Sequence, residues 1–204
     1  MHDLQNRMRS YEKRFRQTVF SDLPFVVRVD GRCFSSFARK VNLDKPVDGY
    51  FSGCMFCVAK ELLNETDGSV LAYRQSDEIS LIFYQPNFKS EPMFGGRVQK
   101  LSSVIASMAS VKFNERLNVD CQPHFDGRVF GLPNLMEVYN YLLWREKDAI
   151  RNSIQRFGQH YFSHSELHNL SCEQIKDKLA SETKIDWDEQ PMEYKRGYYL
   201  KETT

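Results

Sequence analysis

The chain has 204 residues, of which 41% are hydrophobic, and its formal net charge is +1. This length supports one domain with a sizeable core, and a nearly neutral chain lacks the global basic field typical of nucleic-acid binding. It has no run of about 18 apolar residues and its first twenty residues are too charged for a secretory signal, so we expect no membrane span. Five scattered cysteines favour reduced thiols. Together these features predict a cytoplasmic protein.

The hydrophobic pattern predicts helices and strands along the whole chain. Short apolar runs bounded by turn residues indicate strands, and apolar residues at spacings of three and four indicate helices. The expected helices cover residues 1–20, 34–41, 50–64, about 97–117, 133 to about 157, and a shorter segment after Ser171. The expected strands cover 25–29, 70–74, 79–84 and 124–131, with a loop at 86–92.

Up to Gly131 the order is strand, helices, strand, strand, helix, strand. This is the βαββαβ, ferredoxin-like plan of an α+β protein. We therefore expect a catalytic unit over residues 1–132, including the N-terminal helix. Residues 133–204 are expected to form a helical extension packed on the same unit.

In this plan, two short acidic motifs lie at the ends of strands. Asp30 follows the apolar run 25–29, and Asp77 lies in the hairpin connection Gln75-Ser76-Asp77-Glu78. In the ferredoxin-like plan the first and third strands are antiparallel neighbours, so the end of one lies beside the start of the other. The topology therefore predicts that Asp30 and Asp77 lie side by side.

These residues match the ligands that Mg²⁺ prefers. Asp30 and Asp77 supply carboxylates, and Gly31 can offer its carbonyl oxygen because it has no side chain to obstruct the ion. Two ions about 3.5–4 Å apart stabilise the attacking and leaving oxygens of an in-line phosphoryl or nucleotidyl transfer. Strand alternation directs Glu78 away from Asp77, so we expect it to have a supporting role.

Several cations are candidates for an anion site. Gly95-Gly96-Arg97 with Lys100 opens a helix, whose free N–H groups and dipole favour anions. Arg128 lies near the start of a strand. The basic residues of the N-terminal segment are interpreted as a solvated helix face or as an arm that touches phosphate.

The ordered motifs resemble the tRNA-His guanylyltransferase family, including its Thg1-like branch of 3′-to-5′ polymerases. The motifs that carry the resemblance, from about Asp22 to Gly197, are Arg28-Val29-Asp30-Gly31-Arg32 with Phe34 and Phe37, Lys45-Pro46-Val47-Asp48, Gln75-Ser76-Asp77-Glu78, Phe125-Asp126-Gly127-Arg128-Val129, Trp144-Arg145 with Asp148 and Asn152, Ile185-Asp186-Trp187, and Lys195-Arg196-Gly197. The resemblance implies a polymerase-like palm that adds nucleotides to the 5′ end of tRNA. The 5′ end is activated as an adenylate or triphosphate, and the 3′-hydroxyl of the incoming nucleotide attacks it.

The resemblance also implies roles for particular residues. Asp30, the Gly31 carbonyl and Asp77 would hold two Mg²⁺ ions, with Asp30 and Asp77 as the catalytic residues. ATP or GTP would serve as activating and incoming nucleotides, and the subunits would form a homotetramer that binds tRNA. The nucleotide would lie against Asp30, Gly31, Arg32, Cys33, Phe34, Ser35, Lys45, Ser76 and Asp77. Phosphate or RNA-end contacts would come from Arg28, Lys45, Arg97, Lys100, Arg128 and Asn152.

Two departures from the family pattern favour templated repair of 5′-truncated tRNA over addition of G to tRNA-His. Ser35 stands where many relatives have histidine, and 150–153 reads Ile-Arg-Asn-Ser where the eukaryotic guanylyltransferases have His-Ile-Asn-Asn. Two other functions stay open. A nucleotidyl cyclase of the GGDEF or adenylyl type uses a related palm, although no Gly-Gly precedes the acids here. A non-catalytic RNA-binding module on this fold would need neither Asp30 nor Asp77.

Overall fold

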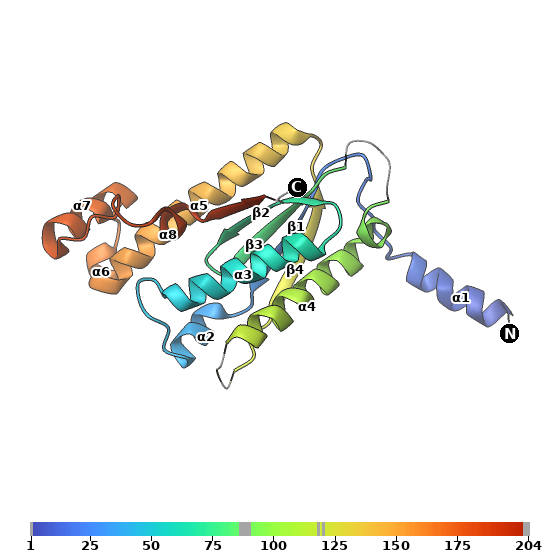
Figure 1. The fold of residues 1–204 in the computed structure, drawn as a ribbon, viewed down its shortest axis with the longest axis horizontal. Helices are drawn as coiled ribbons and strands as arrows, with labels where there is room; N and C mark the ends of the chain where they lie inside the picture. The colour runs from blue at the N-terminus through green and yellow to red at the C-terminus, as the bar shows by residue number, and fades with distance from the viewer. Residues whose placement is uncertain (1, 86–90, 118, 120, 202–204) are drawn as a thin grey trace.

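The computed structural model describes residues 2–85, 91–117, 119 and 121–201, and it is built around one antiparallel sheet (Figure 1). The five strands have the order β4-β1-β3-β2-β5. They are β1 (Phe25–Gly31), β2 (Ser69–Gln75), β3 (Glu78–Phe83), β4 (Phe125–Gly131) and β5 (Tyr198–Lys201). The helices are α1 (His2–Lys13), α2 (Phe34–Lys40), α3 (Gly49–Glu65), the short η1 (Met93–Gly96), α4 (Val98–Arg116), α5 (Leu135–Tyr161), α6 (His164–Leu167), α7 (Cys172–Thr183) and α8 (Met192–Arg196).

Helices cover both faces of the sheet, which explains the nearly continuous apolar run of β1. Val27 and Val29 point into the main core with α3 and α4. Val26 points to the other face, where it packs with Val138 and Tyr141 of α5. Because side chains alternate along a strand, Arg28 and Asp30 share the α5 face with Val26.

The predicted α+β, ferredoxin-like order is confirmed, with β1 and β3 as central antiparallel neighbours. The two long predicted helices are present as α4 and α5, and Asp48 and Asn134 cap α3 and α5 through their side chains. Among the described helices, none combines the length and apolarity that crossing a membrane requires.

Two expectations need correction. The N-terminal helix ends at Lys13 rather than near residue 20. The segment after residue 133 is not wholly helical, because β5 joins the sheet beside β2. This strand is only four residues long and follows Gly197, whose φ of +83° allows the chain to turn into the sheet. Most of the expected loop 86–92 lies outside the described residues.

Candidate active site

The sheet brings Asp30 and Asp77 to adjacent positions at one end. Asp30 is the register partner of Glu78, and the backbone N–H of Gly31 donates to the carbonyl oxygen of Asp77 over 3.2 Å. Both carboxylates line one cavity of about 340 Å³ between the sheet and α5. The juxtaposition predicted from topology is therefore present.

Gly31 is required by the packing beneath the site. A Cβ at this position would lie 2.3 Å from Cδ2 of Phe34. The ring of Phe34 cannot retreat, because it contacts Phe37, Phe51, Phe113 and Phe125 in one aromatic cluster. The close approach of Gly31 to this cluster fixes the backbone where β1 passes into α2.

The site concentrates negative charge. Burial, followed by the neighbouring carboxylates of Asp77, Glu78 and Asp126, raises the pKa of Asp30 from 3.8 to about 6. Burial also raises the pKa of Asp77, although a hydrogen bond from Ser76 opposes the change. Grouped carboxylates with raised pKa values are the arrangement that a bound cation would stabilise.

Glu78 has the supporting position expected from the sequence. Its two carboxylate oxygens accept hydrogen bonds from Nε and Nη2 of Arg145 at 2.8 and 2.6 Å, and both side chains are buried. Arg145 also contacts Asp148 at 3.1 Å, and the amide of Asn152 donates to that same carboxylate at 3.1 Å. The charge of Glu78 is thus paired, whereas Asp30 and Asp77 face the cavity.

A second cavity, of about 610 Å³, lies on the other side of Asp77. The wall between the two cavities consists of the residues that line both of them, which are Ser76, Asp77, Asn152, Arg156, Glu193 and Tyr194. Arg156 strengthens this wall by donating from Nη2 to the hydroxyl of Ser76 over 3.0 Å. The arrangement offers two binding compartments that meet at Asp77.

The predicted nucleotide-contact residues fall around these compartments. Phe34, Ser35 and Lys45 line the larger cavity. Arg32 and Cys33 are exposed on the turn between β1 and α2, directly after Gly31. Every residue predicted to contact the nucleotide therefore lies near the Asp30 end of the sheet.

The predicted phosphate contacts are divided between the two ends of the sheet. Arg28 and Arg128 are register partners on β1 and β4, on the same face as Asp30. Arg97 and Lys100 are not brought to Asp30, because α4 begins near the other end of β1, where Val98 N–H donates to Gln17. An anion site at Arg97 and Lys100 stays a prediction, but it is not part of the Asp30 site.

Sequence reasoning missed Arg156 and the pairing of Arg145 with Glu78. Arg156 lies 80 residues after Ser76, and Arg145 lies 67 residues after Glu78. The available signal was a basic residue every two to five positions along 145–156, but this pattern does not reveal which face of α5 meets the sheet.

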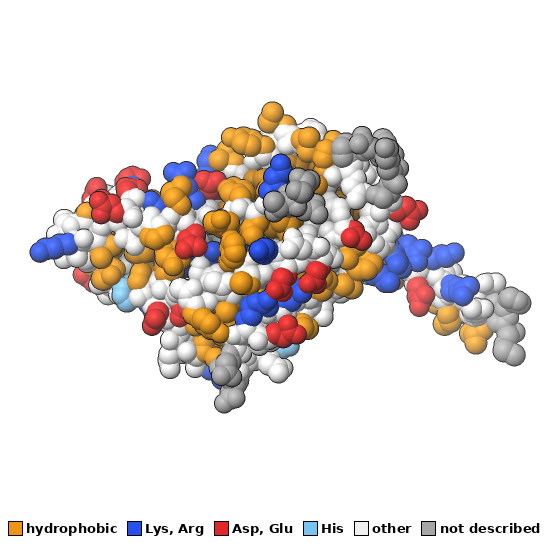
Figure 2. Space-filling view, viewed as in Figure 1, with side chains coloured by type: hydrophobic (Ala, Val, Ile, Leu, Met, Phe, Trp, Pro, Cys, Tyr) orange, Lys and Arg blue, Asp and Glu red, His pale blue; other side chains and the backbone are white. Residues whose placement is uncertain are grey.

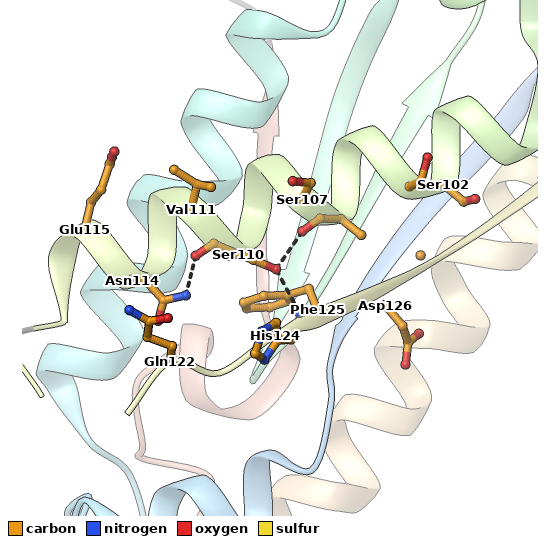
Figure 3. Close-up of a pocket in the computed structure, with 13 residues that line it drawn as sticks. Ser102, Ser107, Ser110, Val111, Asn114, Glu115, Gln122, His124, Phe125 and Asp126 are labelled. Carbon is orange, nitrogen blue, oxygen red and sulfur yellow. Dashed lines mark hydrogen bonds between the residues drawn. The ribbon is translucent and has the colours of Figure 1, made fainter. Parts of the chain in front are cut away.

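A third cavity, of about 790 Å³, lies between α4 and β4 and contains neither Asp30 nor Asp77. Figure 3 shows Ser110 and Asn114 of α4 facing the segment from Gln122 to Asp126. The Ser110 hydroxyl accepts from the Phe125 N–H, and the Asn114 amide donates to the Pro123 carbonyl. These bonds hold α4 to the start of β4, so the polar residues that line this groove have a structural role.

The residues at Asp30 fit a magnesium site that is completed by substrate. Two carboxylates and the Gly31 carbonyl are hard oxygen donors, and Mg²⁺ commonly binds one or two carboxylates together with substrate phosphates and water. Within the described part of the chain, no group of three or more His, Cys, Asp or Glu side chains forms a metal cage. The donor set therefore suits an ion that arrives with a nucleotide.

A palm-type α+β fold with paired carboxylates beside two compartments is typical of nucleotidyltransferases. Residues 5–133 match the family model described as Thg1, tRNAHis guanylyltransferase. The chain belongs to this family, and its members named tRNA(His) guanylyltransferase are nucleotidyltransferases.

Individual relatives agree with this assignment. The chain is 31% identical to the uncharacterized protein R259 of Acanthamoeba polyphaga mimivirus, covering 96% of this chain and 76% of the relative. It is 29% identical to a probable tRNA(His) guanylyltransferase of Bos taurus over 86% of this chain, and it spans only 63% of that relative.

Solved structures extend the likeness to the whole fold. A bacterial tRNA(HIS) guanylyltransferase (Thg1)-like protein in complex with ATP superposes with a TM-score of 0.93 and is 34% identical, covering 97% of this chain and 88% of that one. A bacterial Thg1-like protein in complex with GTP gives a TM-score of 0.86 and 33% identity, covering 98% and 84%.

Proposed function

We propose that the protein is a template-directed 3′-to-5′ nucleotidyltransferase that adds nucleotides to the 5′ end of truncated tRNA. The observation that carries this proposal is that Asp30 and Asp77 line one cavity, while Asp77 also stands on the wall shared with a second cavity. A reaction between a nucleotide and an RNA end needs two compartments that meet at the reacting phosphorus. The ATP and GTP complexes of the bacterial relatives support nucleotides as ligands here.

The catalytic carboxylates have one role in this proposal. Asp30 and Asp77, with the Gly31 carbonyl, would hold two Mg²⁺ ions. When bound, the ions supply charge stabilisation to the attacking and leaving oxygens of the transfer. The carboxylates themselves position the reacting groups and remain ionised while cations are bound.

In this proposal, each of the two cavities binds a different substrate. The cavity of about 610 Å³, which is lined by Phe34, Ser35 and Lys45, would bind a nucleoside triphosphate. The Lys45 ammonium would attract the phosphates of this nucleotide. Asn152 and Arg156 stand on the shared wall, where they would contact the phosphate that passes between the compartments. Ser76, held by Arg156, would fix the turn that presents Asp77.

Addition of G at position −1 of tRNA-His is the second candidate. The family model and the bovine relative carry that activity in their names. Ser35 and the segment 150–153 differ from the pattern of the guanylyltransferases, and this difference favours templated repair. A homotetrameric assembly and a cytoplasmic location stay predictions from the sequence.

The test is incorporation of labelled nucleotides, with Mg²⁺ and ATP, into two RNAs in parallel. One RNA is a tRNA lacking its first 5′ nucleotide, and the other is full-length tRNA-His with a 5′-monophosphate. We expect templated extension of the truncated RNA. G addition to tRNA-His alone would instead identify a guanylyltransferase, and binding of both RNAs without extension would favour a non-catalytic module.

Matched variants connect the activity to the site. Asp30→Ala and Asp77→Ala should abolish incorporation while circular dichroism shows an intact fold. Asp177→Asn on α7 is the control, because Asp177 is an exposed carboxylate that lines neither of the two cavities. Near-normal turnover in Asp30→Ala or Asp77→Ala would overturn the proposed mechanism.

A further inference from the structure

Arg74 is a buried cation that lines the cavity of about 610 Å³, and its guanidinium has fewer acceptors than it can use. Its side chain is only 3% exposed, although it lies near the end of β2, shortly before Asp77. Nη1 donates to the hydroxyl of Ser52 at 3.0 Å, and Nη2 donates to the carboxylate of Glu193 at 3.4 Å. Nε is buried and has no acceptor among the described residues.

These contacts compensate the charge of Arg74 only in part. Taking a charge out of water is costly unless the charge is paired and its donors find acceptors. Arg145 meets this condition, because its Nε and Nη2 bind both oxygens of Glu78 at 2.8 and 2.6 Å. In Arg74 the same edge of the guanidinium has one long contact with Glu193 and one free donor. Burial accordingly lowers the pKa of Arg74, and the Glu193 carboxylate opposes this change.

Glu193 is the loosely held partner in this ion pair. It lies in the first turn of α8, and its side chain is 38% exposed. Glu193 lines both cavities, so it stands on their shared wall together with Asp77. Within the described part of the chain, Arg74 is its only ion-pair partner. Movement of the Glu193 side chain away from Arg74 therefore breaks one long contact and returns a carboxylate to water.

The backbone of α8 is anchored independently of this ion pair. Helix α8 packs against α5 and β2 (Figure 1). The Tyr73 hydroxyl donates to the carbonyl oxygen of Arg196 over 2.6 Å, and the Arg196 guanidinium donates to Glu146 of α5 over 3.3 Å. The Glu193 side chain can therefore change its partner while α8 stays in place.

The cavity that Arg74 lines is the one in which we expect the nucleoside triphosphate. On the face shown in Figure 2, acidic and basic side chains are interspersed over the body of the molecule, so their fields largely cancel at a distance. Three of the cations that line the cavity are exposed to water, namely Arg39, Lys45 and Arg156. Arg74 is buried, so water screens its charge least and the charge acts strongly on an anion in the cavity.

We propose that Arg74 binds a phosphate group of the nucleoside triphosphate and that this phosphate displaces Glu193. The inference rests on the proposed function, because it names a further contact in the same nucleotide cavity. A phosphate offers two oxygens to the edge formed by Nε and Nη2, which a guanidinium binds through parallel hydrogen bonds. Glu193 is displaced because two anions that share one cation repel each other. In the free protein, Glu193 therefore competes with the nucleotide for Arg74.

The competing explanation is that Arg74 and Glu193 only hold α8 against β2. The two explanations predict opposite effects of Glu193→Gln on nucleotide binding. If the ion pair is purely structural, its loss loosens the wall of the cavity and nucleotide binding weakens or stays unchanged. If Glu193 competes with phosphate, removal of its charge frees Arg74 and nucleotide binding becomes tighter.

The experiment measures the Kd of ATP and of adenosine for the full chain by isothermal titration calorimetry, with Mg²⁺ and without RNA. Glu193→Gln should tighten ATP binding about tenfold, and Arg74→Gln should weaken it about tenfold. The double variant should lose the tightening, because the cation that Glu193 screens is absent. Glu182→Gln is the control and should leave the Kd unchanged, since Glu182 is paired with Lys178 on α7 and lines neither cavity.

Unchanged or weaker ATP binding by Glu193→Gln would overturn the proposal, and so would an equal tightening for adenosine, which has no phosphate. If Arg74→Gln does not fold, the partly exposed Glu193 still gives a decisive variant. ATP binding by the wild type with no response in Glu193→Gln would refute the role of Arg74 and leave the proposed function standing. A wild type that binds no nucleotide would overturn both.

Discussion

Replacing Arg145 with methionine leaves the Glu78 carboxylate buried under α5 without the guanidinium that now binds both of its oxygens. The side chains of Arg145 and Glu78 are 9 and 10% exposed, and the two hydrogen bonds measure 2.8 and 2.6 Å. Hydrogen bonds to charged groups contribute about 1.5–3 kcal/mol each, and removing one partner of a buried ion pair costs about 3–5 kcal/mol. We therefore expect Arg145→Met to lower the free energy of unfolding by about 4 kcal/mol.

Urea unfolding followed by circular dichroism measures this loss, and the melting temperature should fall by roughly 10 °C for a chain of this size. The double variant Arg145→Met with Glu78→Met should recover most of the stability, because both charges are then removed from the buried site. Arg151→Met is the control on the same helix, since Arg151 also contacts Asp148 but its side chain is 64% exposed. It should cost less than about 1 kcal/mol.

A loss below about 1 kcal/mol in Arg145→Met would refute the reasoning, because it would mean that water or another cation compensates Glu78. A double variant that is no more stable than the single variant would also refute it. That result would assign the loss to the missing stem of Arg145 rather than to the unpaired carboxylate.

Three further predictions concern the residues that shape the site. Gly31→Ala should lower the free energy of unfolding by about 1–3 kcal/mol, because its Cβ would lie 2.3 Å from the Phe34 ring; a variant as stable as the wild type in urea would contradict this packing. In metal-free protein the raised pKa of Asp30 means that the folded state binds its proton more tightly than the unfolded chain. Stability should therefore fall as the pH rises from about 4 to 6, and Asp30→Asn should remove about 2 kcal/mol of that fall; parallel pH profiles for both proteins would exclude the effect. Gly197→Ala combines a φ of +83° with a Cβ 2.5 Å from the Arg74 carbonyl, so hydrogen exchange of the β5 amides should accelerate, and unchanged exchange would show that β5 adapts.

The sequence was sufficient to predict the centre of the site because its determinants are local or topological. The apolar run before Asp30 specifies a buried strand, and the turn at Ser76 and Asp77 joins two such runs. Once the ferredoxin-like order is recognised, the adjacency of β1 and β3 follows, and the two carboxylates meet. Neither step requires knowledge of how a helix is rotated on the sheet.

The surroundings of the site were not predictable because they depend on that rotation. Arg145, Asp148, Asn152 and Arg156 all lie on α5, and only the packing of Val138 and Tyr141 against the sheet determines which of them reach Glu78 and Ser76. The opposite case is Arg97. Its local signal, a helix start, was correct, but the direction of α4 places that start far from Asp30.

The distribution of charge is compatible with a nearly neutral chain that binds the two polyanionic substrates of the proposed reaction. The carboxylates near the site fall into two groups. Glu78 is paired with Arg145, whereas Asp30 and Asp77 are available for cations. On the wall between the cavities, Arg156 donates to the neutral hydroxyl of Ser76, and its positive charge acts on the nearby Asp77 carboxylate without a direct ion pair. A phosphate at this wall would share the Arg156 cation with Asp77, so substrate attraction depends on where individual charges lie and not on the net charge of +1. By this argument, Arg156→Gln should weaken nucleotide and RNA binding more than it weakens the fold, and separate titrations of binding and urea unfolding would measure the difference.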